Sequence, residues 1–203
     1  MIFACHRINT IKQLKKIPKF YAIEIDLRDY KNKIILHHDP FEQGDNFSKF
    51  LENYDHKFLI LNIKSEGIES KVLKILRKFN IKKYFFLDCT FPAMMKLIKK
   101  KNKNIAIRIS DYESFDNLRK MKNLAKWVWV DCFNKIPLSM QNYKLIKKNK
   151  FKICLVSPEL HMRKINNKKI ISLIKNKKIF IDMLCTKTKF FKIWEKKLNL
   201  NYE

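Results

Sequence analysis

The 203-residue sequence is poor in glycine, proline and acidic residues, and each shortage excludes some classes of structure or function. Two glycines and five prolines leave little room for flexible linkers or long irregular loops. No apolar run approaches the ~20 residues that a membrane-spanning helix needs. We therefore expect a chain without transmembrane segments, and this length favours one domain over residues 1–203.

The cysteines argue against both a disulfide framework and a cysteine-based metal centre. They are five in number, so they cannot all pair, and no two lie at metal-ligand spacing. Each lies in or beside an apolar run, as buried reduced thiols do. Met1 leads directly into the strand-like run Ile2–Cys5, without the pattern of a signal peptide. These features predict a cytoplasmic protein. The cysteines are Cys5, Cys89, Cys132, Cys154 and Cys185.

Positive charge is the most prominent feature of the composition. Lys and Arg total 45 against 19 Asp and Glu, and the formal net charge is +26. The lysines are spread through every segment, whereas a nucleic-acid-binding surface usually gathers Arg and Lys on one face with aromatic side chains between them. We interpret the charge as a solvated surface that attracts anionic substrates such as phosphodiesters, with no specific nucleic acid. A nucleic-acid binder is the alternative, and it requires a steep salt dependence of binding.

Short apolar runs alternate with amphipathic, lysine-rich stretches along the chain. The runs are rich in β-branched and aromatic residues, as buried parallel strands are. Stretches between them, such as 68–79, 91–101, 113–124 and 138–149, have helical periodicity. This alternation predicts a parallel α/β sheet, and eight runs favour a closed barrel over an open doubly wound sheet. The runs are Ile2–Cys5, Ala22–Leu27, Phe58–Ile63, Tyr84–Leu87, Ile105–Ile109, Trp127–Val130, Ile153–Val156 and Ile179–Leu184.

An additional run, Lys33–His38, closely follows the second predicted strand. Only Asp29–Asn32 separates the two, which is too short for a helical crossover. We therefore predict an antiparallel hairpin over Ile23–His38. The expected fold is a single (β/α)8 TIM-type barrel with an extra hairpin strand after strand two.

Ionisable side chains lie at the ends of most predicted strands, where the active sites of such barrels lie. Glu24 and Asp26 are two residues apart on one strand, so both side chains point to the same face. Two close carboxylates share a proton or hold a cation, and oxygen ligands suit Mg²⁺ or Ca²⁺. The alternative is an internal ion pair with Arg28 or Lys64. Possible additional site residues are Asp88, Arg108 and Glu159.

Two histidines are candidates for acid/base catalysis. His6 and His38 could supply the two proton transfers of phosphodiester hydrolysis, because an imidazole titrates near neutrality. Taken singly, each is better explained as a satisfied core or loop histidine. Arg7 and Lys64 could bind phosphate oxygens, or they could balance the charge of the two carboxylates.

The order of these elements resembles the glycerophosphodiester phosphodiesterase family. The family pattern is His-Arg, Glu-x-Asp, His-Asp and Glu-x-Lys; this sequence has His6-Arg7, Glu24-Ile25-Asp26, His38-Asp39 and Asn62-Ile63-Lys64 in that order. The resemblance is specific over residues 1–67. The later strand ends are similar to a short bacterial branch of these phosphatidylinositol-specific phospholipase C-like TIM-barrel phosphodiesterases.

The resemblance implies a TIM-type barrel with a metal-dependent site that cleaves glycerol-linked phosphodiesters, a chemistry of lipid metabolism. The substrate is then a small-molecule or polymer-linked phosphodiester. Carried over residue by residue, His6 and His38 become the acid/base pair, and Arg7 and Lys64 the phosphate-binding residues. Divalent cation ligands, for Mg or Ca, become Glu24, Asp26 and Asn62.

Three positions depart from the family pattern. Asn62 replaces the Glu that would be the third metal ligand, which removes one negative charge. Lys187 stands where the final strand usually has Asp, and Ile8 replaces a Gly. The alternative function is therefore a catalytically weakened barrel that binds a phosphorylated ligand without cleaving it.

Overall fold

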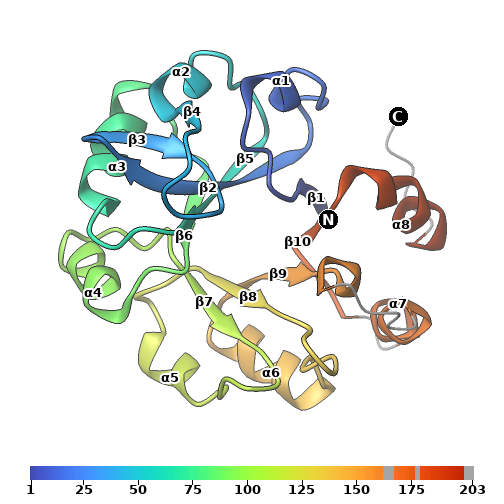
Figure 1. Ribbon diagram of the computed structural model, residues 1–203. Helices are drawn as coiled ribbons and strands as arrows, with labels where there is room; N and C mark the ends of the chain where they lie inside the picture. Colours follow the sequence, from blue (N-terminus) through green and yellow to red (C-terminus); the bar gives the residue numbers. More distant parts are fainter. Residues whose placement is uncertain (162–166, 177–178, 199–203) are drawn as a thin grey trace. The chain divides into compact units, whose positions relative to one another are not determined.

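The computed structural model describes residues 1–161, 167–176 and 179–198, and the chain forms two compact units (Figure 1). One unit is Cys5–Ala106, and the other combines Met1–Ala4 with Ile107–Glu203. Both are α/β structures in which mostly parallel strands alternate with helices. No described helix combines the length and the apolarity that crossing a membrane requires.

The unit Cys5–Ala106 is built on three parallel strands extended by an antiparallel hairpin. The strand order is β4-β3-β2-β5-β6, with β2, β5 and β6 parallel. The strands are β2 (Ala22–Tyr30), β3 (Lys33–Leu36), β4 (Asp45–Asn46), β5 (Phe58–Ile63) and β6 (Tyr84–Leu87). The helices are α1 (Ile11–Leu14), α2 (Phe47–Leu51), α3 (Glu69–Lys78) and α4 (Phe91–Lys99).

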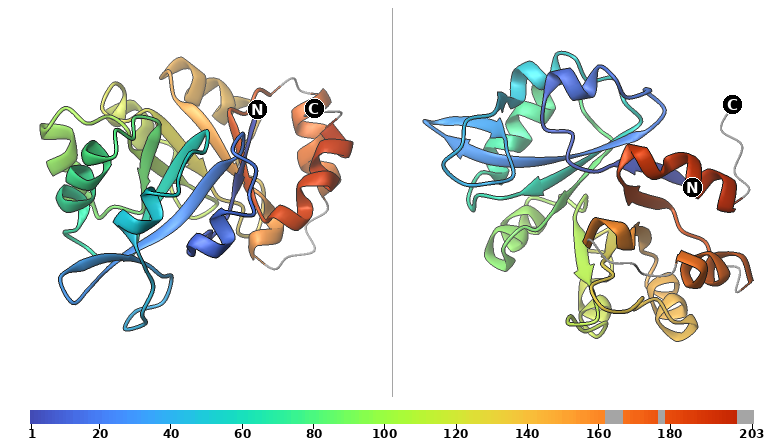
Figure 2. Two further views of the ribbon diagram at one scale, coloured as in Figure 1. Left: turned by 90° about the horizontal axis from the view of Figure 1, so that it is seen from above. Right: turned by 45° about the vertical axis from the view of Figure 1, so that its right-hand side comes forward.

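The turn between β2 and β3 explains why these strands pair. Lys31 and Asn32 both have positive φ, 46° and 61°, as a two-residue type I′ turn requires. Tyr30 and Lys33 therefore face each other, and the antiparallel pairing extends back to Leu27 and Leu36. Figure 2 shows these strands from two further sides. This turn places the carboxyl end of β3 beside the middle of β2.

Strand β2 is buried on both faces, although the two faces differ in chemistry. Ile23, Ile25 and Leu27 are fully buried, and they alternate with Glu24 and Asp26, which are also fully buried. Alternate residues of a strand share a face, so the two carboxylates lie together on one side of the sheet. Burying two carboxyl groups is costly unless hydrogen bonds and opposite charges compensate them. The polar face of β2 therefore needs partners from neighbouring segments.

The strands of the second unit lie in the order β1-β10-β9-β8-β7. The pairs β8–β9 and β9–β10 are parallel. Helix α6 contacts β9, and α7 contacts α8. The elements are β1 (Ile2–Cys5), β7 (Ala106–Ile109), α5 (Asn117–Met121), β8 (Trp127–Val130), α6 (Met140–Lys148), β9 (Lys152–Val156), α7 (Asn167–Asn176), β10 (Met183–Thr186) and α8 (Phe191–Leu198), with short 3-10 helices at Pro158–His161 and Thr188–Phe190.

The predicted last strand and the helix expected over 113–124 differ most from the structure. The last strand begins at Met183 and reaches Thr186, whereas the apolar run led us to expect Ile179–Leu184. Ile179 and Ile181 are buried, but burial alone does not place a residue in the hydrogen-bonded ladder. The helix expected over 113–124 is only α5, because Lys122 leaves the helical conformation and Asn123 has a positive φ of 66°.

None of the five cysteines, all of which lie in the described residues, forms a disulfide, and four of them are buried. Burial raises the pKa of Cys5 to about 12, because an apolar environment disfavours the thiolate. The same cause raises the pKa of Cys132 to about 12. These thiols therefore act as small apolar core residues.

Candidate active site

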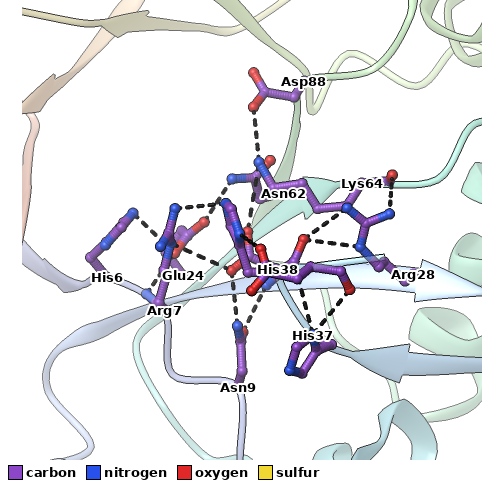
Figure 3. Close-up of polar contacts among 12 residues, drawn as sticks. His6, Arg7, Asn9, Glu24, Arg28, His37, His38, Asn62, Lys64 and Asp88 are labelled. Carbon is purple, nitrogen blue, oxygen red and sulfur yellow. Dashed lines mark hydrogen bonds and ion pairs between the residues drawn. The ribbon is translucent and has the colours of Figure 1, made fainter. Parts of the chain in front are cut away.

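The polar face of β2 is the centre of a cluster that lies within the unit Cys5–Ala106 (Figure 3). Strand pairing brings its parts together. Asp26 on β2 is the register partner of Asn62 on β5. The backbone N–H of Lys64 donates to the Leu27 carbonyl, and that of His37 donates to the Asp26 carbonyl. The segments that follow β1, β3 and β5 therefore all pass beside Glu24 and Asp26.

The Glu24 carboxylate accepts hydrogen bonds on both of its oxygens. The backbone N–H of Arg7 donates to Oε2 over 2.6 Å, and the Asn62 amide donates to Oε1 over 2.9 Å. His6 Nε2 lies 3.9 Å from Oε2. Arg7 has a φ of 56°, an uncommon conformation for a residue other than glycine, and it directs its N–H toward the carboxylate. The Glu24 carboxylate thus helps to hold the backbone of the His6-Arg7 segment in place.

The Asp26 carboxylate is held by an asparagine that sequence reasoning missed. Asn9 Nδ2 donates to Asp26 Oδ2, and the Asp26 backbone N–H donates to Asn9 Oδ1, both over 2.9 Å. Arg7 Nε lies 3.9 Å from Oδ2, and Lys64 Nζ lies 3.7 Å from Oδ1. The nearness of Asn9 to His6 and Arg7 along the chain was the available signal, but no residue spacing indicated its partner.

Lys64 and Asp88 connect the ends of β5 and β6. Lys64 Nζ lies 3.5 Å from Asp88 Oδ2, in addition to its contact with Asp26. Asp88 directly follows β6 and has a positive φ of 57°. Of the possible additional residues, Asp88 therefore belongs to this cluster, and the positive charge of Lys64 lies between Asp26 and Asp88.

Arg28 does not pair with the carboxylates. Its Nε and Nη2 donate to the carbonyl of His38 over 3.0 and 2.8 Å, and its Nη1 donates to the carbonyl of Lys64 over 2.9 Å. One guanidinium therefore joins the segments after β3 and β5 through their backbones. The ion pairs of Asp26 come from Lys64 and Arg7 instead.

His38 lies at the exposed side of the cluster, where both of its ring nitrogens have partners. Nε2 lies 2.6 Å from Arg7 Nη2, and Nδ1 lies 2.8 Å from Asp39 Oδ1. The side chains of Arg7 and His38 are 48% and 37% exposed, so a ligand in solvent can reach them, whereas His6 is 15% exposed. Arg7 therefore lies between the segment of His6 and the imidazole of His38 (Figure 3).

Burial raises the pKa of Glu24 to about 8, and the charge of Asp26 adds to this effect. The hydrogen bonds from Arg7 and Asn62 and the charge of Lys64 act in the opposite direction. The hydrogen bond from His38 holds the pKa of Asp39 below the usual range. The cluster therefore combines a buried proton-binding carboxyl group with an exposed ionised one.

The oxygen atoms of the cluster fit a hard divalent cation. Within the described part of the chain, Asp26 Oδ1 and Asn62 Oδ1 are buried and accept no hydrogen bond. They belong to register partners on adjacent strands, and carboxylate and amide oxygens are ligands of Mg²⁺ and Ca²⁺. No three His, Cys, Asp or Glu side chains of residues 1–161, 167–176 and 179–198 form a metal-binding group, and the third proposed ligand here is the amide Asn62.

Arg108 and Glu159 belong to the other unit and have their own partners there. Arg108 Nη1 donates to Asp131 Oδ2 over 2.9 Å, and His161 Nε2 contacts the second oxygen of that carboxylate. Glu159 Oε1 accepts hydrogen bonds from Thr186 and Trp194. These contacts join strand ends within that unit.

Comparison with known proteins identifies the fold. No protein-family model matches the sequence, and no curated protein matches it. Two solved structures match over most of the chain. A glycerophosphodiester phosphodiesterase from Agrobacterium tumefaciens has a TM-score of 0.62 and 10% identity, covering 91% of this chain and 96% of its own. A glycerophosphoryl diester phosphodiesterase from Parabacteroides distasonis has a TM-score of 0.64 and 10% identity, covering 97% and 86%. The chain thus has the fold of glycerophosphodiester phosphodiesterases, as the motif order led us to expect.

Proposed function

We propose that this protein is a metal-dependent phosphodiester hydrolase that acts on a glycerophosphodiester-like substrate. The observation that carries the proposal is the convergence of His6 and Arg7 on the two buried carboxylates of β2, with His38 in contact with Arg7. Residues distant in the sequence meet there with the chemistry that cleavage of a phosphodiester needs: cations for the phosphate oxygens and imidazoles for the proton transfers.

The cations bind the substrate phosphate. Arg7 is nearly half exposed, and its planar guanidinium can donate to two phosphate oxygens at once. Lys64 supplies a point charge from the opposite segment, held between Asp26 and Asp88. Together they offset the negative charge of the phosphate beside Glu24 and Asp26, and the net charge of +26 increases the encounter rate with anionic substrates.

The histidines move the protons. One imidazole accepts the proton of the attacking hydroxyl group, and the other donates a proton to the leaving alkoxide, so that no strong base is released. His38 has an adjacent carboxylate, Asp39, that orients its ring. His6 lies against Glu24, whose raised pKa allows a proton to be held there.

A divalent cation, Mg or Ca, completes the proposed site with Glu24, Asp26 and Asn62 as ligands. Such an ion supplies charge stabilisation for the phosphoryl oxygens. The two buried oxygens of Asp26 and Asn62 that accept no hydrogen bond among the described residues support this assignment. With two carboxylates and one amide, we expect weaker binding than three carboxylates give.

We also propose a barrel architecture, a cellular location and a metabolic role for the protein. We propose that the fold is a single-domain (β/α)8 barrel, in which β2 and β3 form the additional hairpin. The protein is cytoplasmic and acts in the metabolism of lipid head groups or polymer-linked glycerol phosphates. The strand ends that carry the cluster are where such barrels hold their active sites.

The test is hydrolysis of an aryl phosphodiester and of glycerophosphocholine with Mg²⁺, Mn²⁺ or Ca²⁺ added. We expect turnover that requires a metal and that falls at least ~100-fold in His6→Gln and in His38→Gln. His56→Gln is the matched control, because His56 Nε2 donates to the Ile17 carbonyl, away from the cluster. Undiminished turnover in both site variants would show that the assignment is wrong.

One observation favours a second function, the binding of a phosphorylated ligand without cleavage. Asn62 donates to Glu24 rather than adding a third carboxylate, which is how such a site would lose its cation. This function predicts that calorimetry detects binding of a phosphoester while phosphorus NMR detects no product at any metal concentration.

A further inference from the structure

The contact between Arg7 and His38 determines where the imidazole carries its proton. A guanidinium has only N–H donors and no acceptor. Since Arg7 Nη2 lies 2.6 Å from His38 Nε2, this nitrogen must accept the hydrogen bond and cannot carry a proton. A neutral imidazole then carries its proton on Nδ1, where Asp39 Oδ1 accepts it over 2.8 Å. The two contacts together define one tautomer of His38.

This tautomer is the one that a general base needs, but its basic nitrogen is covered. The lone pair of Nε2 points at Arg7 and cannot accept a proton from another group while the contact persists. Asp39 is positioned to stabilise the imidazolium that forms once Nε2 takes a proton, as an orienting carboxylate does in other His-Asp pairs. His38 is therefore prepared for catalysis and blocked at the same time.

Arg7 can leave this contact without moving His38. Its side chain is 48% exposed, and its ionic contact with Asp26 is long, at 3.9 Å. The backbone of His38 is held independently by two hydrogen bonds from Arg28. An anionic phosphate group, whether in a diester or as inorganic phosphate, is a stronger partner for a guanidinium than a neutral imidazole is. A phosphate that binds Arg7 therefore competes directly with Nε2.

We propose that Arg7 masks the general base His38 until the phosphate of the substrate draws the guanidinium away. This inference rests on the proposed function and adds a regulatory step to it. Once uncovered, Nε2 forms an N–H bond with the proton of the attacking hydroxyl as that O–H bond breaks, and Nδ1–H continues to donate to Asp39. The mask prevents His38 from binding a proton or another ligand before a phosphate is present.

The experiment is ¹⁵N NMR of the histidine ring nitrogens in the full chain at about pH 8, above the ordinary imidazole pKa of about 6.5. Inorganic phosphate is the probe, and the His38 signals are assigned by their loss in His38→Gln. Without phosphate, we expect a proton on Nδ1 and a hydrogen-bonded, unprotonated Nε2. Added phosphate should move the Nε2 signal downfield, toward a nitrogen without a hydrogen bond, while the Nδ1 signal stays in place.

Two variants separate the mask from other effects of phosphate. In Arg7→Gln, the Nε2 signal should already lie downfield and should not respond to phosphate. Arg77→Gln, which changes an exposed arginine on α3 of the same unit, should behave as the wild type. If Arg7→Gln does not fold, Arg7→Lys provides the same comparison with the charge retained.

The NMR experiment tests the masking of His38 by Arg7, and a hydrolysis assay tests the proposed hydrolase separately. A proton on Nε2 in the phosphate-free protein, or an Nε2 signal that phosphate leaves in place, overturns the mask. A protein with the expected NMR response and no hydrolysis of phosphodiesters would retain the Arg7–His38 contact as described and refute the proposed hydrolase.

Discussion

Replacing Asn9 by alanine should destabilise the fold through the loss of two hydrogen bonds to one buried residue. Asn9 Nδ2 donates to Asp26 Oδ2, and Asn9 Oδ1 accepts from the Asp26 N–H, both over 2.9 Å. Asp26 is fully buried, so water cannot replace these partners. A hydrogen bond to a charged group contributes about 1.5–3 kcal/mol, and a buried N–H left without a partner costs about 1–3 kcal/mol.

Together these values predict that Asn9→Ala lowers the free energy of unfolding by roughly 3–5 kcal/mol. In a protein of this length, that corresponds to a decrease in Tm of roughly 10 °C. Urea unfolding followed by circular dichroism measures the difference. Asn53→Ala is the matched control: the exposed Asn53 side chain donates to the Lys49 carbonyl, so its loss should change stability by less than about 0.5 kcal/mol. A loss below about 1 kcal/mol in Asn9→Ala would refute the reasoning.

Three further predictions concern a close backbone approach and the cation site. Gly44→Ala should lower Tm much more than Gly67→Ala, because a Cβ at Gly44 would lie 2.2 Å from the Leu36 carbonyl oxygen. At Gly67 an alanine meets only the strain of a φ of 88°. Equal decreases of Tm in thermal unfolding would contradict this prediction. Without metal, Glu24 should stabilise the fold most below its ordinary pKa of 4.5 and lose this contribution as the pH rises through its folded-state pKa of about 8. Glu24→Gln should therefore flatten the dependence of the unfolding free energy on pH, and an unchanged dependence would contradict the raised pKa. Asn62→Glu should increase Mg²⁺ affinity at least ~10-fold in calorimetry, since it adds a third carboxylate; a weaker site would exclude position 62 as a ligand.

Much of the cluster could be predicted because strand geometry is periodic. Glu24 and Asp26 share a face wherever that segment forms a strand, and both are buried on the same side of β2. The carboxyl ends of β2 and β5 coincide because they pair in parallel register, which brings Asn62 beside Asp26. The apolar runs indicated these strands since buried parallel strands are apolar along most of their length.

The contacts of long or loop side chains could not be predicted in the same way. Arg28 lies two residues after Asp26 on β2, which suggested an ion pair, but its long side chain reaches the carbonyls of His38 and Lys64. The hydrogen bonds of Asn9 depend on how the chain turns after β1, and no periodicity describes that turn. Asp39 follows His38 directly, yet its contact with Nδ1 depends on the rotamers of both side chains.

The same limit applies to the last strand. Ile179 and Ile181 are as buried as strand residues, so hydrophobicity could not distinguish them from the ladder that begins at Met183. Asp182 marks the boundary, because its carboxylate accepts a hydrogen bond from the N–H of Ile153. Backbone pairing, and not burial, defines where a strand begins.

The central claim is that His6 and His38 serve one phosphodiesterase site through the cluster around Arg7, Glu24 and Asp26. The most direct measurement follows glycerophosphocholine by phosphorus NMR with Mg²⁺ present, using the wild type and the His6→Gln/His38→Gln double variant. We predict that the wild type produces a phosphomonoester signal and that the double variant, folded by circular dichroism, produces none. An equal rate of phosphomonoester formation by the two proteins would contradict the claim.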